Sequence, residues 1–170
     1  MSDQKILFIK RRLHHQKHAI DKGHFVSSEG NVYEFDLTPS VNRKENDFLK
    51  ILMNIMKNED PIQKIDKSLI MQTYDLLDLV DENIEMNCAF IGCEITSEML
   101  LAFYNDKLIC LSISGNQIGF IDDNVIQEIL DILNREDFYS WEILGQKYSI
   151  GDIKKKYGID NWFRNPVFYK

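Results

Sequence analysis

The sequence predicts an α+β fold in which helices pack against an antiparallel β-meander. Short runs of β-branched and aromatic residues are bounded by turn residues, as expected of strands. Two segments between residues 42 and 85 repeat apolar side chains with the period of a helix. The turns between residues 87 and 121 are too short for helical crossovers, so neighbouring strands there must be antiparallel. A length of 170 residues favours one domain over residues 1–170.

The first predicted elements are a strand and a hairpin. Residues 5–12 surround the apolar run Ile6 to Ile9 and are predicted to form a strand. Segments 24–28 and 32–37 flank Glu29-Gly30-Asn31, three residues that are typical of a tight turn. These two segments are therefore expected to pair as a hairpin.

Two helices are predicted next. In the first, Asn42 is the expected N-cap with Glu45 three residues later. Its apolar positions are Phe48, Leu52, Ile55 and Met56. The second is expected to begin at Asp60-Pro61, because proline suits the first helical position and aspartate suits the cap. Its apolar positions are Ile62, Ile65, Leu69, Ile70, Leu76, Leu77 and Val80.

Four strands are then predicted, at residues 88–95, 99–104, 108–113 and 117–121. The turns between them are Thr96-Ser97, Asn105-Asp106 and Gly115-Asn116, which predicts a meander. The apolar run 108–111 indicates a central strand covered on both faces. A further helix follows, capped by Asp123 or Asn124, with Ile126, Ile129, Leu130 and Leu133 on its apolar face. A short helix at residues 149–157 and an extended tail complete the prediction.

Composition excludes several classes of protein. The net charge of −7 argues against a general binder of nucleic acid or of anionic membranes. The first apolar run has only four residues, too few for a secretory signal, and the longest uncharged stretch, residues 108–121, is shorter than the roughly twenty residues of a bilayer span. Three cysteines do not suggest a disulfide framework. We therefore expect a cytoplasmic protein with no membrane partner.

No enzyme motif is present. The phosphate-binding, dinucleotide-binding, nucleophile-elbow and zinc-protease patterns are all absent from the sequence. His14, His15, His18 and His24 form a cluster in which His14 and His18 could share a metal on a helix, but no glutamate follows His14 and no cysteine is near. Cys88, Cys93 and Cys110 are expected to be small buried hydrophobes. We expect no catalytic residue, metal or cofactor; a hydrolase or nuclease using His14, His18 and His24 is the alternative within the enzyme class.

Charge is distributed unevenly along the chain. Residues 1–24 and 147–170 each carry a balance of +4, whereas residues 25–146 carry −15. On a helix with 100° per residue, the side of the second predicted helix opposite its apolar face carries the four carboxylates Asp75, Asp78, Glu82 and Glu85. Like charges on one face repel, and a basic partner would relieve the repulsion. We expect these four residues to contact a basic protein.

The basic C-terminal segment supports an alternative. Residues 148–159 are similar to the first helix and turn of a helix-turn-helix, with Ser149 and Asp152 as a capping box and Gly158 as the stop. The would-be recognition helix, residues 160–165, is interrupted by Pro166 and is too short to read a major groove. A DNA-binding transcriptional regulator is therefore the second hypothesis, and no nucleic-acid partner is expected under the first.

Taken as a whole, the chain resembles the immunity proteins of bacterial contact-dependent inhibition and polymorphic toxin systems. Segment 23–36 is similar to the opening hairpin of several of them, and the small size, acidity and α+β character also fit. The resemblance implies binding of a cognate toxin domain, expected to be a nuclease, and occlusion of its active site, with no small-molecule substrate. These proteins share no catalytic residues, so no site is implied. Binding could use the acidic face, or the toxin could add a strand to an exposed sheet edge.

Overall fold

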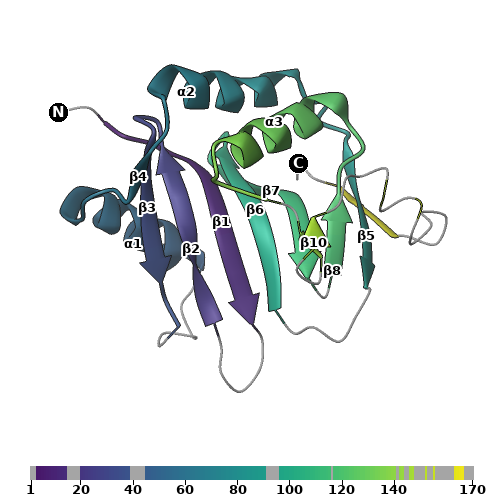
Figure 1. Cartoon of the computed structure of the whole chain (residues 1–170), viewed down its shortest axis with the longest axis horizontal. Helices are drawn as coiled ribbons and strands as arrows, with labels where there is room; N and C mark the ends of the chain where they lie inside the picture. Colours follow the sequence, from purple (N-terminus) through teal and green to yellow (C-terminus); the bar gives the residue numbers. More distant parts are fainter. Residues whose placement is uncertain are drawn as a thin grey trace.

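A computed structural model describes residues 3–14, 20–38, 45–90, 96–115, 117–140, 142–143, 146–147, 152, 155 and 163–166. It shows an antiparallel sheet with helices on both faces, an α+β fold as predicted (Figure 1). The order of the strands in the nine-stranded sheet is β11-β5-β8-β7-β6-β1-β2-β3-β4, and β10 pairs with β9 in a separate ribbon. None of the helices in these ranges is long and apolar enough to cross a membrane.

The elements have the following bounds. The strands are β1 (Ile6–His14), β2 (Ile20–Ser27), β3 (Asn31–Asp36), β4 (Gln63–Lys64), β5 (Glu85–Phe90), β6 (Thr96–Tyr104), β7 (Lys107–Gly115), β8 (Gln117–Phe120), β9 (Glu142–Ile143), β10 (Gln146–Lys147) and β11 (Phe163–Pro166). The helices are α1 (Glu45–Asn58), α2 (Lys67–Asp75), the 3-10 helix η1 (Leu76–Leu79) and α3 (Asn124–Arg135).

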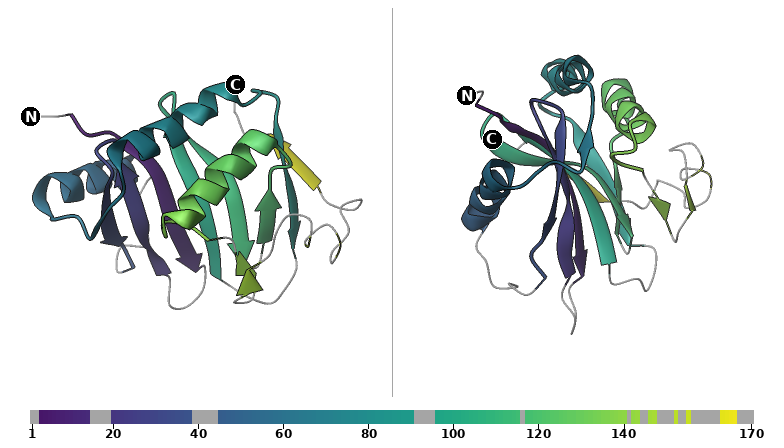
Figure 2. Two further views of the ribbon diagram at one scale, coloured as in Figure 1. Left: turned by 45° about the horizontal axis from the view of Figure 1, so that its top comes forward. Right: turned by 60° about the vertical axis from the view of Figure 1, so that its left-hand side comes forward.

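The sheet separates two hydrophobic cores. Helix α1 lies on one face, and α2 and α3 lie on the other, as the right-hand view of Figure 2 shows. The core beneath α1 contains Ile9, Phe25, Phe35, Phe48, Leu52 and Leu101. The core beneath α2 and α3 contains Phe8, Val26, Ile70, Leu77, Leu100, Leu111, Ile126 and Leu133. Alternate residues of one strand thus enter different cores, since neighbouring side chains point to opposite faces.

An arginine attaches α1 to the sheet. Arg11 on β1 donates Nε and Nη2 hydrogen bonds to the two carboxylate oxygens of Asp21 on β2, at 2.9 and 2.8 Å. The same guanidinium lies 4.0 Å from the ring centroid of Phe48 on α1. A planar cation both pairs with a carboxylate and stacks on an aromatic face, which lysine cannot do equally well. Phe48 in turn meets Phe35 of β3 edge to face.

The predictions for α1 and α3 are confirmed, whereas most of the short helix predicted at residues 149–157 lies outside the described residues. Helix α1 buries Phe48, Leu52 and Met56 as expected; the expected cap Asn42 lies outside the described residues. For α3 the cap is Asp123, whose side chain accepts hydrogen bonds from the backbone of Val125 and Ile126. A cap of this kind satisfies N–H groups that the first turn leaves unpaired.

The prediction for the second helix is wrong at both ends. Residues 60–62 precede strand β4, and Ile62 is exposed. Helix α2 begins only at Lys67, after Asp66 accepts a hydrogen bond from the backbone N–H of Leu69 at 3.0 Å. Ile65, expected on the helix, is buried ahead of it. Asp60-Pro61 suits a turn as well as a helix start, so the chain can make a strand first.

The predicted meander is confirmed for three strands and wrong for the fourth. Strands β6, β7 and β8 are consecutive neighbours, but β5 pairs with β8, and the place beside β6 is taken by β1. Thr96 and Ser97 belong to β6 and do not form the expected turn. The central β7 is covered on both faces as predicted: Ile109 and Leu111 lie in one core, and Leu108 packs against the other.

The hairpin β2–β3 requires a glycine at its turn. Gly30 has a φ of 82°, a left-handed conformation that strains other residues. A Cβ atom at this position would lie 2.0 Å from the carbonyl oxygen of Ile65, which precedes α2. The backbone also bonds there, with Ile65 N–H donating to Gly30 O at 2.8 Å. The hairpin and the segment before α2 are therefore held in close contact.

We predict that Gly30→Ala lowers the free energy of unfolding by about 2 kcal/mol or more, because it adds both backbone strain and a clash. The matched control is Asp137→Gly. Asp137 also has a positive φ, 56°, and is exposed. Glycine adopts this conformation without strain, so Asp137→Gly should raise the free energy of unfolding by about 0.5–1 kcal/mol. Urea unfolding followed by circular dichroism measures both; equal stability of Gly30→Ala and the unaltered protein would contradict the prediction.

Candidate protein-binding surface

The four predicted contact residues are all exposed, but they do not share one helix. Asp75 is the last residue of α2 and Asp78 lies in η1. Glu82 lies in the turn that follows, and Glu85 is the first residue of β5. The expectation that all four form a stripe on a single helix is therefore wrong, although their place on a partner-binding surface remains a prediction.

The helix stops because its last turn tightens and the chain then extends. Leu77 is buried in η1, and Val80 adopts an extended conformation with a φ of −82° and a ψ of 134°. The carboxylate of Asp81 then accepts a hydrogen bond from the backbone N–H of Asn83 at 2.8 Å. This turn, made by a side chain that competes with helical hydrogen bonding, directs the chain into β5.

Tyr74 of α2 holds the helix against the end of the sheet. Its hydroxyl donates a hydrogen bond to the backbone carbonyl of Phe103 at 2.6 Å. Its ring meets Phe8 of β1 edge to face, with 5.9 Å between centroids, and Tyr104 of β6 at 6.0 Å. Tyr74 is thus held by the Phe103 carbonyl, the Phe8 ring and the Tyr104 ring. These contacts also fix the position of the next residue, Asp75.

A third carboxylate, which the sequence pattern did not indicate, joins Asp75 and Asp78. Asp106 lies in the two-residue turn between β6 and β7, where Asn105 and Asp106 have φ values of 52° and 61°. Burial raises the pKa of the Tyr74 hydroxyl, and the negative charges of Asp78, Asp75 and Asp106 raise it further. All three carboxylates therefore act on one phenol. An acidic residue at a hairpin turn facing a helix end is a non-local arrangement that helical periodicity cannot find.

Tyr104 connects the turn to η1. Its hydroxyl donates a hydrogen bond to the carboxylate of Asp78. This bond favours the neutral phenol and is the main reason that the pKa of Tyr104 is raised to about 12. We call Tyr74, Asp75, Asp78, Tyr104 and Asp106 the tyrosine–carboxylate cluster.

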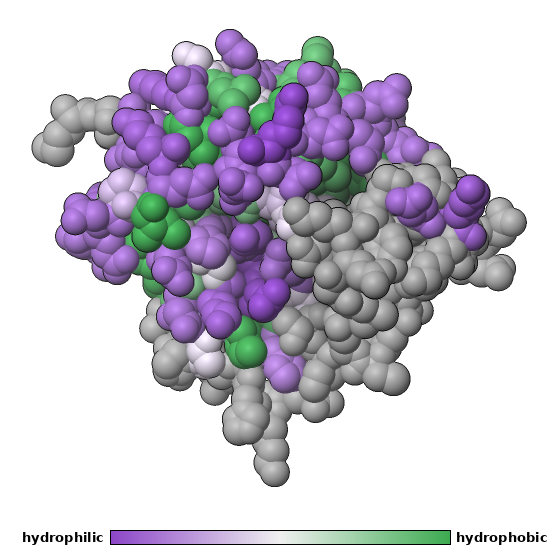
Figure 3. Space-filling model, viewed as in Figure 1, coloured by the Kyte–Doolittle hydropathy of each residue, from purple (hydrophilic) through white to green (hydrophobic). Residues whose placement is uncertain are grey.

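Three ion pairs of the described residues lie outside this cluster. They are Arg11–Asp21, Arg12–Glu98 and Lys67–Glu29, and none of the three includes Asp75, Asp78 or Asp106. The described residues on the face that carries α2 and α3 are mostly hydrophilic, with small apolar patches between polar side chains (Figure 3). Leu79, which follows Asp78, is 70% exposed. Exposed carboxylates attract a basic protein, and contact with that protein would bury the exposed leucine.

The described histidines do not form a metal site. His24 lies opposite Lys10 on β1, and His14 lies four residues farther along that strand, roughly 13 Å away at the rise of a strand. Burial and the charge of Lys10 lower the pKa of His24, against an opposing effect of Glu34. Among the described residues no group of His, Cys, Asp and Glu could hold a metal ion. His15 and His18 lie outside them.

Of the two described cysteines, Cys88 is buried as expected and Cys110 is half-buried. Cys88 is 1% exposed. Burial raises the pKa of the Cys110 thiol to about 12, so the thiol is protonated near neutrality and is a weak nucleophile. Cys93 lies outside the described residues.

The described residues of the C-terminal segment include part of the predicted recognition helix, and that part is a strand. Most of residues 148–162, including Ser149 and Gly158, lie outside the described residues. Phe163–Pro166 forms β11, which pairs with β5 through Phe163–Cys88 and Arg164–Asn87. Residues 163–165, expected in a short recognition helix, are instead an edge strand of the sheet.

Comparisons with models of known protein families, with curated proteins and with solved structures found no match to this chain.

We predict that Tyr104 titrates near pH 12 and that Asp78→Asn moves its pKa toward the usual 10.0, because the amide removes the accepting charge. The folded pKa lies above the ordinary value, so the stabilisation is complete below pH 10 and is lost as the pH rises toward 12. Tyrosinate absorbance, taken as the difference between the protein and Tyr104→Phe, measures this; titration of Tyr104 near pH 10 in the unaltered protein would contradict it.

Proposed function

We propose that this protein is an immunity protein, a cytoplasmic stoichiometric inhibitor that binds a basic, nucleic-acid-cleaving toxin domain and occludes its active site. The observation that supports this most directly is the tyrosine–carboxylate cluster. Asp75, Asp78 and Asp106 come from a helix end, a 3-10 helix and a hairpin turn, yet all three act on Tyr74. Negative charge is thus gathered on one part of the surface, as a steering site for a basic partner requires.

The cluster is also pre-organised. Hydrogen bonds from Tyr74 to Phe103 and from Tyr104 to Asp78 hold its parts in place before any partner arrives. Pre-organised groups lose little conformational entropy on binding, and tyrosines are common at the centres of protein interfaces. Long-range attraction between an acidic inhibitor and a basic enzyme increases association rates by about 10 to 10³, and salt weakens the effect.

We predict that the full chain, used as an affinity bait in extracts of its native host, recovers one basic protein in equimolar amount and suppresses that protein's nuclease activity at a 1:1 ratio. Calorimetry with the recovered protein is expected to show affinity that falls as salt rises. Asp75→Asn/Asp78→Asn should slow association at low salt about ten-fold, because steering charge is lost.

The control for this double variant is Glu128→Gln/Asp131→Asn. Glu128 and Asp131 are exposed on α3, and the substitution removes the same net charge elsewhere. The control should associate at nearly the original rate. Salt-independent binding would replace charge steering with strand addition at a sheet edge, and failure to recover any equimolar partner would contradict the function itself.

A further inference from the structure

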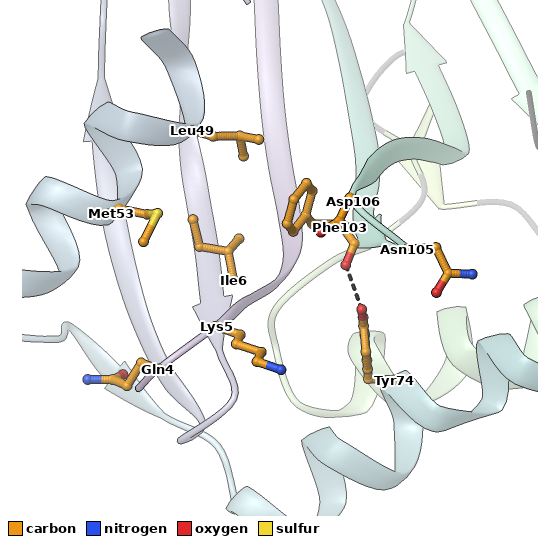
Figure 4. Close-up of a pocket in the computed structure, with 9 residues that line it drawn as sticks. All are labelled: Gln4, Lys5, Ile6, Leu49, Met53, Tyr74, Phe103, Asn105 and Asp106. Atoms are coloured by element: carbon orange, nitrogen blue, oxygen red, sulfur yellow. Dashed lines mark hydrogen bonds between the residues drawn. The ribbon is translucent and has the colours of Figure 1, made fainter. Parts of the chain in front are cut away.

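A groove runs across the end of the sheet between α1 and α2. Its volume is about 490 Å³, within the range of about 300–1,000 Å³ that is typical of ligand pockets. Nine residues line it: Gln4, Lys5, Ile6, Leu49, Met53, Tyr74, Phe103, Asn105 and Asp106. Figure 4 shows Leu49, Met53 and Ile6 on one side, Phe103 between the two sides, and Tyr74 with Asn105 on the other.

One wall of the groove is apolar and partly exposed. Met53 on α1 is 45% exposed, one of the most exposed large apolar residues in the described part of the chain. Together with Ile6, Leu49 and Phe103 it forms a surface that could bury an apolar side chain. Methionine adapts its shape readily, and it is common at surfaces that receive varied apolar groups.

The groove is preformed. At one end, the Gln4 side chain accepts a hydrogen bond from Ser27 Oγ at 2.7 Å, and the backbone N–H of Lys5 donates to Ser28 Oγ at 2.9 Å. At the other end, Tyr74 donates to the carbonyl of Phe103 (dashed line in Figure 4). Both ends are thus attached to the sheet, so an occupant would not need to open the groove.

Negative charge outnumbers positive charge at the Tyr74 end of the groove. Asp106 and Tyr74 line this end, and Asp75 and Asp78 add their negative charges around the same tyrosine. Lys5 also lines the groove, and Figure 4 shows its ammonium directed toward Tyr74. Lys107 follows Asp106 in the chain, so three carboxylates outnumber two lysines there. An occupant with an apolar anchor and cationic neighbours on the Asp106 side would match this pattern.

We propose that the groove receives a segment of the partner protein in which an aromatic or long apolar side chain is flanked by lysine or arginine. The apolar side chain inserts between Met53 and Phe103, and a flanking cation contacts the tyrosine–carboxylate cluster through Asp106. This inference rests on the proposed function and defines the recognition element of the partner. Burial of the anchor supplies affinity that salt does not weaken, whereas the carboxylates supply steering.

The test uses three acetylated and amidated peptides, with the sequences Lys-Lys-Phe-Lys-Lys, Lys-Lys-Ser-Lys-Lys and Glu-Glu-Phe-Glu-Glu. Methyl NMR of the full chain follows the signals of Ile6, Leu49 and Met53 during titration. The basic phenylalanine peptide is expected to shift all three signals and to bind about ten-fold or more tightly than the serine peptide. The acidic peptide is expected to leave them unchanged.

Two substitutions in the groove, each with a control substitution outside it, distinguish loss of groove binding from a general effect on the fold. Met53→Ala should weaken binding of the basic phenylalanine peptide at least three-fold, whereas Ile62→Ala should not, since Ile62 is 56% exposed and does not line the groove. Asp106→Asn should weaken the binding of both basic peptides, and Asp131→Asn on α3 should not. All four residues are exposed, so the fold is expected to tolerate all four substitutions.

The outcomes distinguish the inference from the proposed function. Equal binding of both basic peptides, with unchanged methyl signals from Ile6, Leu49 and Met53, would overturn the groove inference. The proposed function would then still be tested by the association rate of Asp75→Asn/Asp78→Asn with the recovered partner. Binding of the acidic peptide would overturn the charge complementarity, and binding of no peptide would overturn the inference as a whole. Equimolar capture of a basic protein is measured independently of all three peptides.

Discussion

The hydrogen bond between Tyr74 and the carbonyl of Phe103 determines how the candidate surface is arranged. Phe103 lies one residue beyond the last pair that joins β1 to β6, Phe8 with Ala102. At that end of the sheet, Tyr74 supplies both a donor to the backbone and a ring that packs on Phe8. A single side chain of α2 thus donates the hydrogen bond that a buried carbonyl group generally requires. The ring of the same side chain covers part of the apolar core.

This attachment explains why the carboxylates and the groove are neighbours. Tyr74 and Asp106 both line the groove, and the charges of Asp75, Asp78 and Asp106 all raise the pKa of the Tyr74 hydroxyl. Apolar contact and negative charge therefore meet at one aromatic ring. Protein interfaces commonly combine a central apolar anchor with a charged border, because the anchor contributes affinity and the border contributes speed and selectivity. The described surface provides both within a short distance of α2.

Local features of the sequence were sufficient to predict much of the fold, but not the pairing of distant strands. The Glu29-Gly30-Asn31 turn, the apolar face of α1 and the Asp123 cap all depend on neighbouring residues, and all were confirmed. The predicted start of α2 at Asp60-Pro61 is wrong because the cap is Asp66, six residues later. The predicted end is wrong because the side chain of Asp81 forms a turn there. Asp106 acts on Tyr74 only because the turn between β6 and β7 packs near α2. A contact between distant segments of this kind leaves no periodic pattern in the sequence.

The place of β1 in the sheet has a consequence for how the chain is made. During synthesis, β1, β2 and β3 leave the ribosome early and can pair as consecutive hairpins, but β6, the other neighbour of β1, follows only after some ninety residues. Until then, one side of β1 has backbone groups with no strand beside them. Sheets assembled from such distant segments form slowly. The nascent protein therefore passes through a stage with an open strand edge, at which a chaperone would be expected to act.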